Sequence, residues 1–152
     1  MRYRLIAVGR LKRGFFEQGC DRYVKLLSAL TQLEVVEVRD HSSAGVAEAR
    51  ERHARESLAA ADGHLVLVDE AGSSHTTVGL AATVSELEQR GVSRMTFLVG
   101  GPDGHSDELR AAANMSLSLS PFTFPHELAR LVLLEQLYRI EALRSGHPYH
   151  RG

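Results

Sequence analysis

The chain has a single cysteine and no excess of either charge. Cys20 alone cannot form a disulfide within the chain, which is typical of a reducing compartment. It lies in a series of apolar residues spaced three and four apart, which predicts a buried helix residue rather than a reactive thiol. Because 18 Lys and Arg are balanced by 19 Asp and Glu, the formal net charge is -1. Strong nonspecific attraction to RNA or DNA is therefore not expected, although a local basic patch is compatible with this composition.

Several other features are missing. No apolar run approaches the roughly 20 residues that cross a membrane, and the first residues lead into a strand rather than a signal peptide. We therefore expect a soluble, cytoplasmic protein with no membrane partner. No Ser-His-Asp or Cys-His arrangement and no spaced pair of carboxylates supports a hydrolase. His147 and His150 have the spacing of metal ligands but lack a nearby acidic or Cys partner, so no metal site is expected.

Strand and helix patterns alternate along the chain. Short apolar runs predict strands at residues 2–8, 33–38, 65–68 and 95–99, and alternating leucine and serine predict another that ends near 119. Helical patterns separate these strands, and residues 69–74 have the composition of a loop. The alternation predicts a single α/β domain over residues 1–152 with a mostly parallel sheet. The last helix, at residues 125–143, is apolar on more than one face, which favours burial against a second subunit.

Three predicted strands end in small or turn-forming residues, after Val68, Val99 and Leu119. The second of these loops reads Gly-Gly-Pro-Asp-Gly at residues 100–104, and Pro121 and Pro125 stiffen the third. Ligands of parallel sheets bind beyond the carboxyl ends of the strands. Because hardly any Lys or Arg lies in these loops, they suit an adenine and ribose better than a polyphosphate. The glycine loop matches neither G-x-G-x-x-G nor a Walker loop, and taken alone it is equally typical of a plain turn.

Further candidates for binding or proton transfer are His126, Arg130, Tyr149, His150 and Arg151. The last three lie in the C-terminal tail, where they supply a stacking ring, a titratable group and a phosphate-binding fork. A disordered terminus is the alternative interpretation of that tail. Residues 9–14, Gly-Arg-Leu-Lys-Arg-Gly, form the densest basic segment. They are interpreted as a solvated loop, with contact to RNA phosphates as the alternative.

With these motifs in view, the chain resembles the RlmH-type SPOUT methyltransferases, which act on pseudouridine in large-subunit ribosomal RNA. The resemblance covers essentially the whole length and rests on Gly-Gly-Pro-Asp-Gly at 100–104, Thr-Phe-Pro-His at 123–126 and the ending His-Pro-Tyr-His-Arg at 147–151. It implies a Rossmann-like α/β fold with a C-terminal trefoil knot, a homodimer, and S-adenosyl-L-methionine as cofactor. The cofactor contacts that it implies are Val68, Gly100, Leu119, Ser120, Pro121, Phe122, Thr123 and Phe124.

The implied activity is methylation of the 3-position ring nitrogen of a pseudouridine in 23S rRNA, on the assembled ribosome and with no DNA partner. His150, Arg130 and Tyr149 are the expected catalytic residues, and Arg151 and His126 are expected to bind RNA. The tail and the cofactor loops are expected to meet across two subunits. Two features depart from the family pattern: Val68, where relatives often have leucine, and the basic segment 9–14, where the family varies.

Two other functions are compatible with the residues that carry this resemblance. The cofactor loops do not specify the acceptor, so a SPOUT methyltransferase acting on another RNA, such as a tRNA, fits the same residues. The other alternative is a ribosome-associated binding factor that has kept the fold without catalysis.

Overall fold

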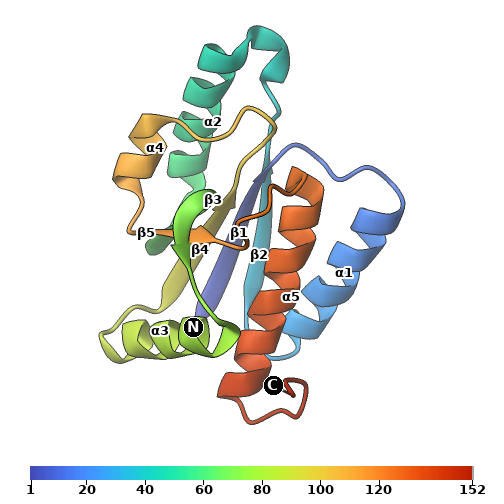
Figure 1. Ribbon diagram of the computed structural model, residues 1–152, viewed down its shortest axis with the longest axis vertical. Coiled ribbons are helices and arrows are strands. Elements are labelled where there is room, and N and C mark those ends of the chain that lie inside the picture. Colours follow the sequence, from blue (N-terminus) through green and yellow to red (C-terminus); the bar gives the residue numbers. More distant parts are fainter. Residues whose placement is uncertain (152) are drawn as a thin grey trace.

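Five strands form one parallel sheet at the centre of the molecule (Figure 1). The computed structural model describes residues 1–151. The strands are β1 (Arg2–Val8), β2 (Leu33–Val38), β3 (His64–Ser74), β4 (Arg94–Val99) and β5 (Met115–Ser118). Their order across the sheet is β2-β1-β4-β3-β5, and every neighbouring pair is parallel. The prediction of a single α/β domain with a parallel sheet is thus confirmed, whereas the trefoil knot stays a prediction.

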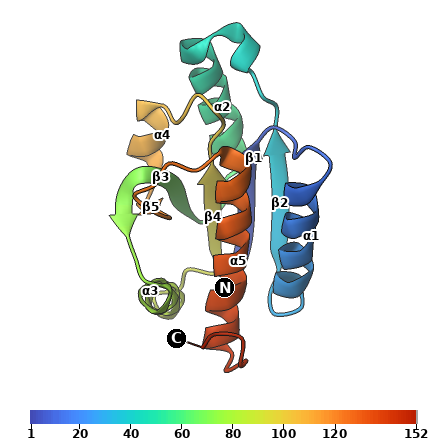
Figure 2. The ribbon, with the colours of Figure 1, turned by 45° about the vertical axis from the view of Figure 1, so that its right-hand side comes forward.

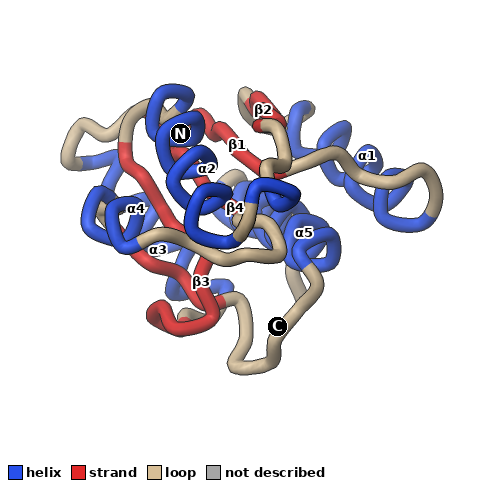
Figure 3. Tube along the Cα trace, turned by 90° about the horizontal axis from the view of Figure 1, so that it is seen from above, coloured by secondary structure: helices blue, strands red, loops and turns tan. Residues whose placement is uncertain are grey.

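Helices cover both faces of the sheet, because successive strand residues point to opposite sides. α1 (Phe15–Ser28), α3 (Thr77–Gln89) and α5 (His126–Arg144) pack with Leu5, Val66 and Phe97 in one core. α2 (Val46–Ala60) and α4 (Asp107–Ala112) pack with Ile6 and Leu67 in the other, and the short 3-10 helix η1 (Ser42–Ala44) precedes α2. Figure 3 shows α1 and α5 next to each other on one side of the molecule. The continuous apolar runs of the central strands are explained by this double burial.

Cys20 is buried in α1, as its spacing predicted. Burial raises the pKa of its thiol to about 11, which keeps the sulfur protonated at neutral pH. Within residues 1–151, none of the helices has both the length and the apolar character needed to span a bilayer.

β3 is longer than its apolar run predicts. Residues 69–74 were expected to form a loop, but the strand continues to Ser74 and pairs again with β5 after a shift in register. Gly72 makes this approach feasible, since a Cβ at that position would lie 2.7 Å from the carbonyl carbon of Ser116. The prediction of a loop was wrong because an edge strand far along the sequence supplies the pairing partner.

α5 connects the two ends of the molecule. It begins directly after Pro125, at the end of the sheet where the strands finish, and it ends beside both termini (Figures 1 and 2). Leu133, Leu134, Leu137 and Ile140 are fully buried, whereas Leu128 and Val132 are only half-buried. Additional cover for this helix by a second subunit stays a prediction.

Candidate functional site

A cavity of about 410 Å³ lies beyond the carboxyl ends of β3, β4 and β5. It is lined by residues 68–70, by residues 99–102, 104 and 105, by residues 119, 120 and 122–126, and by Arg110 and Ala129. All three loops that the sequence singled out therefore meet at one place. Of the eight expected cofactor contacts, seven line the cavity: Val68, Gly100, Leu119, Ser120, Phe122, Thr123 and Phe124. Pro121 is exposed beside them, and contact of all eight residues with a cofactor stays a prediction.

His105 connects two of the loops, and the sequence reasoning did not single it out. Its Nε2 donates a hydrogen bond to the carbonyl oxygen of Val68 at 2.8 Å, and its ring lies against Gly100. Burial lowers the pKa of His105, so the ring is neutral at neutral pH. Because a carbonyl only accepts hydrogen bonds, Nε2 carries the proton. The position of this ring, directly after the glycine loop, was the one signal that the sequence offered.

Hydrogen bonds within the third loop add to the stiffness that its prolines give it. Ser118 Oγ donates to the carbonyl oxygen of Ser120 at 3.0 Å, and the N–H of Phe122 donates to Ser120 Oγ at 2.9 Å. Thr123 Oγ1 donates to Glu70 at 2.7 Å, which ties this loop to the end of β3. The Phe122 ring is 80% exposed, so it stands at the open side of the cavity.

The charges around the cavity are few and partly paired. Arg110 Nε donates to Asp69 Oδ2 at 3.0 Å. Burial alone would raise the pKa of Asp69, but hydrogen bonds from the Ala71 N–H and from Arg110 bring it below its ordinary value. Asp69 is therefore ionised and its charge is offset by Arg110. Among the described residues that line the cavity, Arg110 is the one arginine and none is a lysine, a lining that suits an adenine and ribose better than a polyphosphate.

The start of α5 also borders this region. His126 is exposed and lines the cavity. Arg130, one turn further on, is 8% exposed, and its Nη1 donates to Glu37 Oε2 at 2.8 Å. This ion pair engages one terminal nitrogen of the Arg130 guanidinium and holds the side chain between α5 and β2.

The C-terminal tail lies at the opposite end of α5 (Figure 2). The Tyr149 ring packs on Tyr138 with 4.5 Å between ring centroids, and the Arg139 guanidinium lies 4.7 Å from the Tyr149 centroid. His150 is half-buried and Arg151 is exposed. Tyr138 lies 12 residues after His126, the first residue of α5, so at about 1.5 Å per residue Tyr149 packs about 18 Å along the helix from its start. Within one chain, the tail and the cavity are therefore not brought together.

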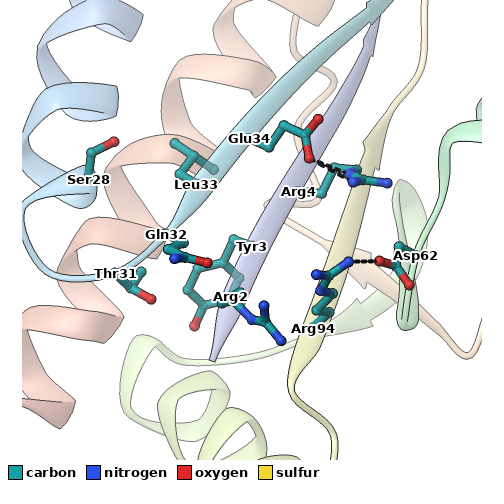
Figure 4. A pocket seen from close by; sticks show the side chains of 10 residues that line it. All are labelled: Arg2, Tyr3, Arg4, Ser28, Thr31, Gln32, Leu33, Glu34, Asp62 and Arg94. Carbon is teal, nitrogen blue, oxygen red and sulfur yellow. Dashed lines mark hydrogen bonds and ion pairs between the residues drawn. The ribbon is translucent and has the colours of Figure 1, made fainter.

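A second cavity, of about 440 Å³, lies at the amino ends of β1, β2 and β4 (Figure 4). Arg4 pairs with Glu34 at 2.7 Å and Arg94 pairs with Asp62. The two cavities are similar in volume, but parallel sheets place their ligands at the carboxyl ends of strands. The cavity beyond β3, β4 and β5 is thus the candidate site. Residues 1–151 contain no group of three or more His, Cys, Asp or Glu side chains placed to hold a metal ion.

A family model described as "Predicted SPOUT methyltransferase" matches residues 1–150. The chain therefore belongs to the SPOUT methyltransferase family. Proteins named "Ribosomal RNA large subunit methyltransferase H" from Gloeobacter violaceus and Synechococcus sp. (strain CC9605) are both 43% identical to it. These matches cover 100% and 99% of the chain and 100% and 97% of the relatives. The resemblance to the RlmH-type members of the family is thus confirmed.

Solved structures of lower similarity were also found. A putative methyltransferase from Legionella pneumophila, in complex with the bound cofactor SAM, matches with a TM-score of 0.49 and 12% identity over 91% of the chain. The SpoU methyltransferase AviRb from Streptomyces viridochromogenes, in complex with the cofactor AdoMet, matches with a TM-score of 0.45 and 16% identity over 90% of the chain. The chain spans 66% and 56% of the lengths of these two structures.

Proposed function

We propose that this chain transfers a methyl group from S-adenosyl-L-methionine to the 3-position ring nitrogen of a pseudouridine in 23S rRNA. The observation that carries the proposal is the meeting of three strand-end loops at one cavity in an RlmH-type chain. The name of the relatives, which specifies ribosomal RNA of the large subunit, supports the choice of substrate. A cytoplasmic location and the assembled ribosome as substrate belong to the same proposal.

The cavity suits this cofactor in its lining and its charge. Backbone groups and uncharged side chains of the three loops fit an adenine and ribose, and Gly100 leaves room for close approach of the backbone. The exposed Glu70 carboxylate adds negative charge beside the cavity, which favours a ligand with cationic groups. Val68, Gly100 and residues 119–124 would hold the cofactor.

When bound, the cofactor supplies an electrophilic methyl group on a sulfonium. The residues of the chain must then align the acceptor nitrogen with that group while the N–C bond forms and the S–C bond breaks. They must also provide for the loss of the proton from that nitrogen. We assign the proton to His150, with Tyr149 packing against the base and with His126 and Arg151 binding the RNA. Arg130, held by Glu37, supports the start of α5 beneath this site.

These assignments require a homodimer, because Tyr149 packs on Tyr138, about 18 Å along α5 from the start of the helix, where the cavity of the same chain lies. The tail of one chain would complete the cavity of the other. Two variants test this arrangement: Ser120→Trp, which fills the cavity, and His150→Ala, which removes the proposed proton acceptor. Each alone should be inactive. When the two variants are mixed at equal amounts and exchange subunits, about half of the dimers contain one chain of each kind. Each such dimer has one intact site out of two, so about one quarter of all sites in the mixture should be active.

If each chain builds its site alone, the mixture stays inactive, because every chain carries one defect. Unchanged single-turnover methylation by His150→Ala would remove its role as proton acceptor and leave the dimer to be tested with Tyr149→Ala in its place.

The proposed substrate is tested by offering joined ribosomes, free large subunits, protein-free rRNA and tRNA with labelled cofactor. Mass spectrometry then locates any methylated nucleotide. We expect methylation of a pseudouridine in 23S rRNA, most rapidly on joined ribosomes. Methylation confined to tRNA would contradict the proposal. Calorimetry with S-adenosyl-L-methionine distinguishes a methyltransferase, of either rRNA or tRNA, from a ribosome-associated binding factor without catalysis. The binding factor is expected to show no binding even at millimolar cofactor.

A further inference from the structure

Residues 10–13 form an exposed cationic loop at the rim of the candidate site. The loop follows β1, whose end is fixed by a hydrogen bond from the Gly9 N–H to the carbonyl oxygen of Val38 at 2.8 Å, and it ends where α1 begins. Arg10, Lys12 and Arg13 are all exposed. Among residues 1–151, no acidic side chain forms an ion pair with any of these three, in contrast to the paired Arg110 and Arg130.

Two contacts place this loop beside the cavity. The backbone N–H of Lys12 donates to Glu127 Oε1 at 3.3 Å, in the first turn of α5. Gly9 and Arg10 also border a small hollow together with Gly100 and His126, and these last two residues line the candidate cavity as well. A nucleotide that enters the cavity would therefore carry its backbone past the cationic loop.

The charges on the rest of the molecule provide little attraction for the phosphates of a nucleic acid. The net charge is -1, and Arg110, the arginine that lines the cavity, is engaged by Asp69. Attraction to the phosphates of a nucleic acid must then come from a local group of unpaired cations. Arginine and lysine on an exposed loop bind phosphate oxygens without reading sequence, and they set the position of the strand that they hold.

We propose that Arg10, Lys12 and Arg13 bind the phosphodiester backbone of the RNA next to the methylated nucleotide. This inference rests on the proposed function and adds to it a binding surface for the substrate. The loop holds the RNA and takes no part in binding the cofactor or in the chemical step.

The test compares two triple variants. One carries Arg10→Gln, Lys12→Gln and Arg13→Gln. The matched control carries Arg22→Gln, Lys25→Gln and Arg90→Gln, which also removes two arginines and one lysine, all exposed and away from the cavity. Binding and methylation of ribosomes and of protein-free rRNA are measured between 50 and 200 mM salt. The affinity for S-adenosyl-L-methionine and the dimer mass are measured alongside.

The loop variant should raise KM for RNA at least about tenfold at low salt and leave kcat and cofactor affinity unchanged. The slope of log affinity against log salt should become shallower by about 2, since each lost phosphate contact contributes about 0.7 to 0.9. The control should change neither quantity. Equal behaviour of the two variants would overturn the inference. So would a loop variant that binds protein-free rRNA normally but loses ribosomes, because the contact would then be with a ribosomal protein.

Failure of the proposed function would look different, because the unmodified chain would then transfer no methyl group to rRNA. In that case fluorescence anisotropy with a labelled 12-nucleotide oligouridylate still decides whether the loop binds RNA. A salt slope that is the same for the unmodified chain and the loop variant would refute phosphate binding.

Discussion

Gly100 leaves the candidate site no room for a side chain, and Gly100→Ala tests how the cavity is held together. A Cβ at this position would lie 2.8 Å from Cε1 of His105 and 3.2 Å from both ring nitrogens. The ring is 7% exposed and donates to Val68, so it cannot move aside without breaking that hydrogen bond. Overpacking costs about 1–3 kcal/mol. Loss of the hydrogen bond adds about 0.5–1.5 kcal/mol. The free energy of unfolding should therefore fall by about 2–4 kcal/mol.

A double-mutant cycle isolates the cause. His105→Ala removes both the ring that blocks the new methyl group and the hydrogen bond to Val68. In that background Gly100→Ala should cost little, so the two substitutions should be coupled by nearly the full cost of the single variant, about 2–4 kcal/mol. Urea unfolding gives these free energies. Calorimetry with S-adenosyl-L-methionine should show weaker binding by each single variant, because both change the wall formed by Val68 and Gly100.

Gly19→Ala provides the control. Its Cβ would lie 3.0 Å from the flexible end of the Leu131 side chain, and alanine is favoured over glycine within a helix by up to about 1 kcal/mol. Its stability should be unchanged or higher. The reasoning fails if Gly100→Ala is as stable as the unmodified chain, or if it costs the same with and without His105.

Two further predictions concern the ionisable groups around the site. Burial lowers the pKa of His105 below its ordinary 6.5, so between the two pKa values the unfolded chain binds a proton that the folded chain does not bind. The contribution of His105 to the free energy of unfolding should therefore be complete above about pH 6.5. It should fall by up to about 1.4 kcal/mol per pH unit as the pH drops toward the folded pKa. Urea unfolding from pH 5 to 8 should show a shallower fall for His105→Gln, and an unchanged slope would contradict this origin. Glu37→Gln leaves the Arg130 charge unpaired, so it should lower the free energy of unfolding by about 1–3 kcal/mol. This is less than for a fully buried ion pair, because Glu37 is 35% exposed. Glu34→Gln disrupts an exposed ion pair, so in the same urea denaturation assay it should lower the free energy of unfolding by less than about 1 kcal/mol. Equal losses for Glu34→Gln and Glu37→Gln would contradict the greater importance of the Arg130–Glu37 pair.

The strands were predictable where burial alone determines them. Residues 65–68 and 95–99 are apolar throughout because helices cover both faces of the sheet. The continuation of β3 to Ser74 was not predictable in the same way. Its residues are small and polar, and they form a strand because β5 offers a free edge and Gly72 allows the two backbones to approach. That partnership depends on the register of a strand more than forty residues away, which no local pattern reveals.

The candidate site was likewise predictable from the sequence only in part. The three loops were predictable because parallel strands end at one edge, and turn-forming residues follow each of them. The contacts that join the loops were not, since the hydrogen bond from His105 to Val68 spans 37 residues of sequence. Arg130 was expected to be a catalytic residue, and that role stays a prediction. Its ion pair with Glu37 joins α5 to β2 through residues 93 positions apart in the sequence, a contact that the helix pattern does not specify.

The length of α5 determines how a complete site can form. The Tyr138 ring and the Arg139 guanidinium hold Tyr149 against the second half of this helix, about 18 Å from its start beside the cavity. A tail fixed in this way reaches a cavity only if the start of another α5 lies beside it. Two α5 helices that pack antiparallel about a twofold axis satisfy this for both chains at once, since the same contact is made twice. The half-buried Leu128 and Val132, four residues apart on one face of α5, are available for such packing. One helix would thus provide both the dimer contact and the distance that makes the dimer necessary.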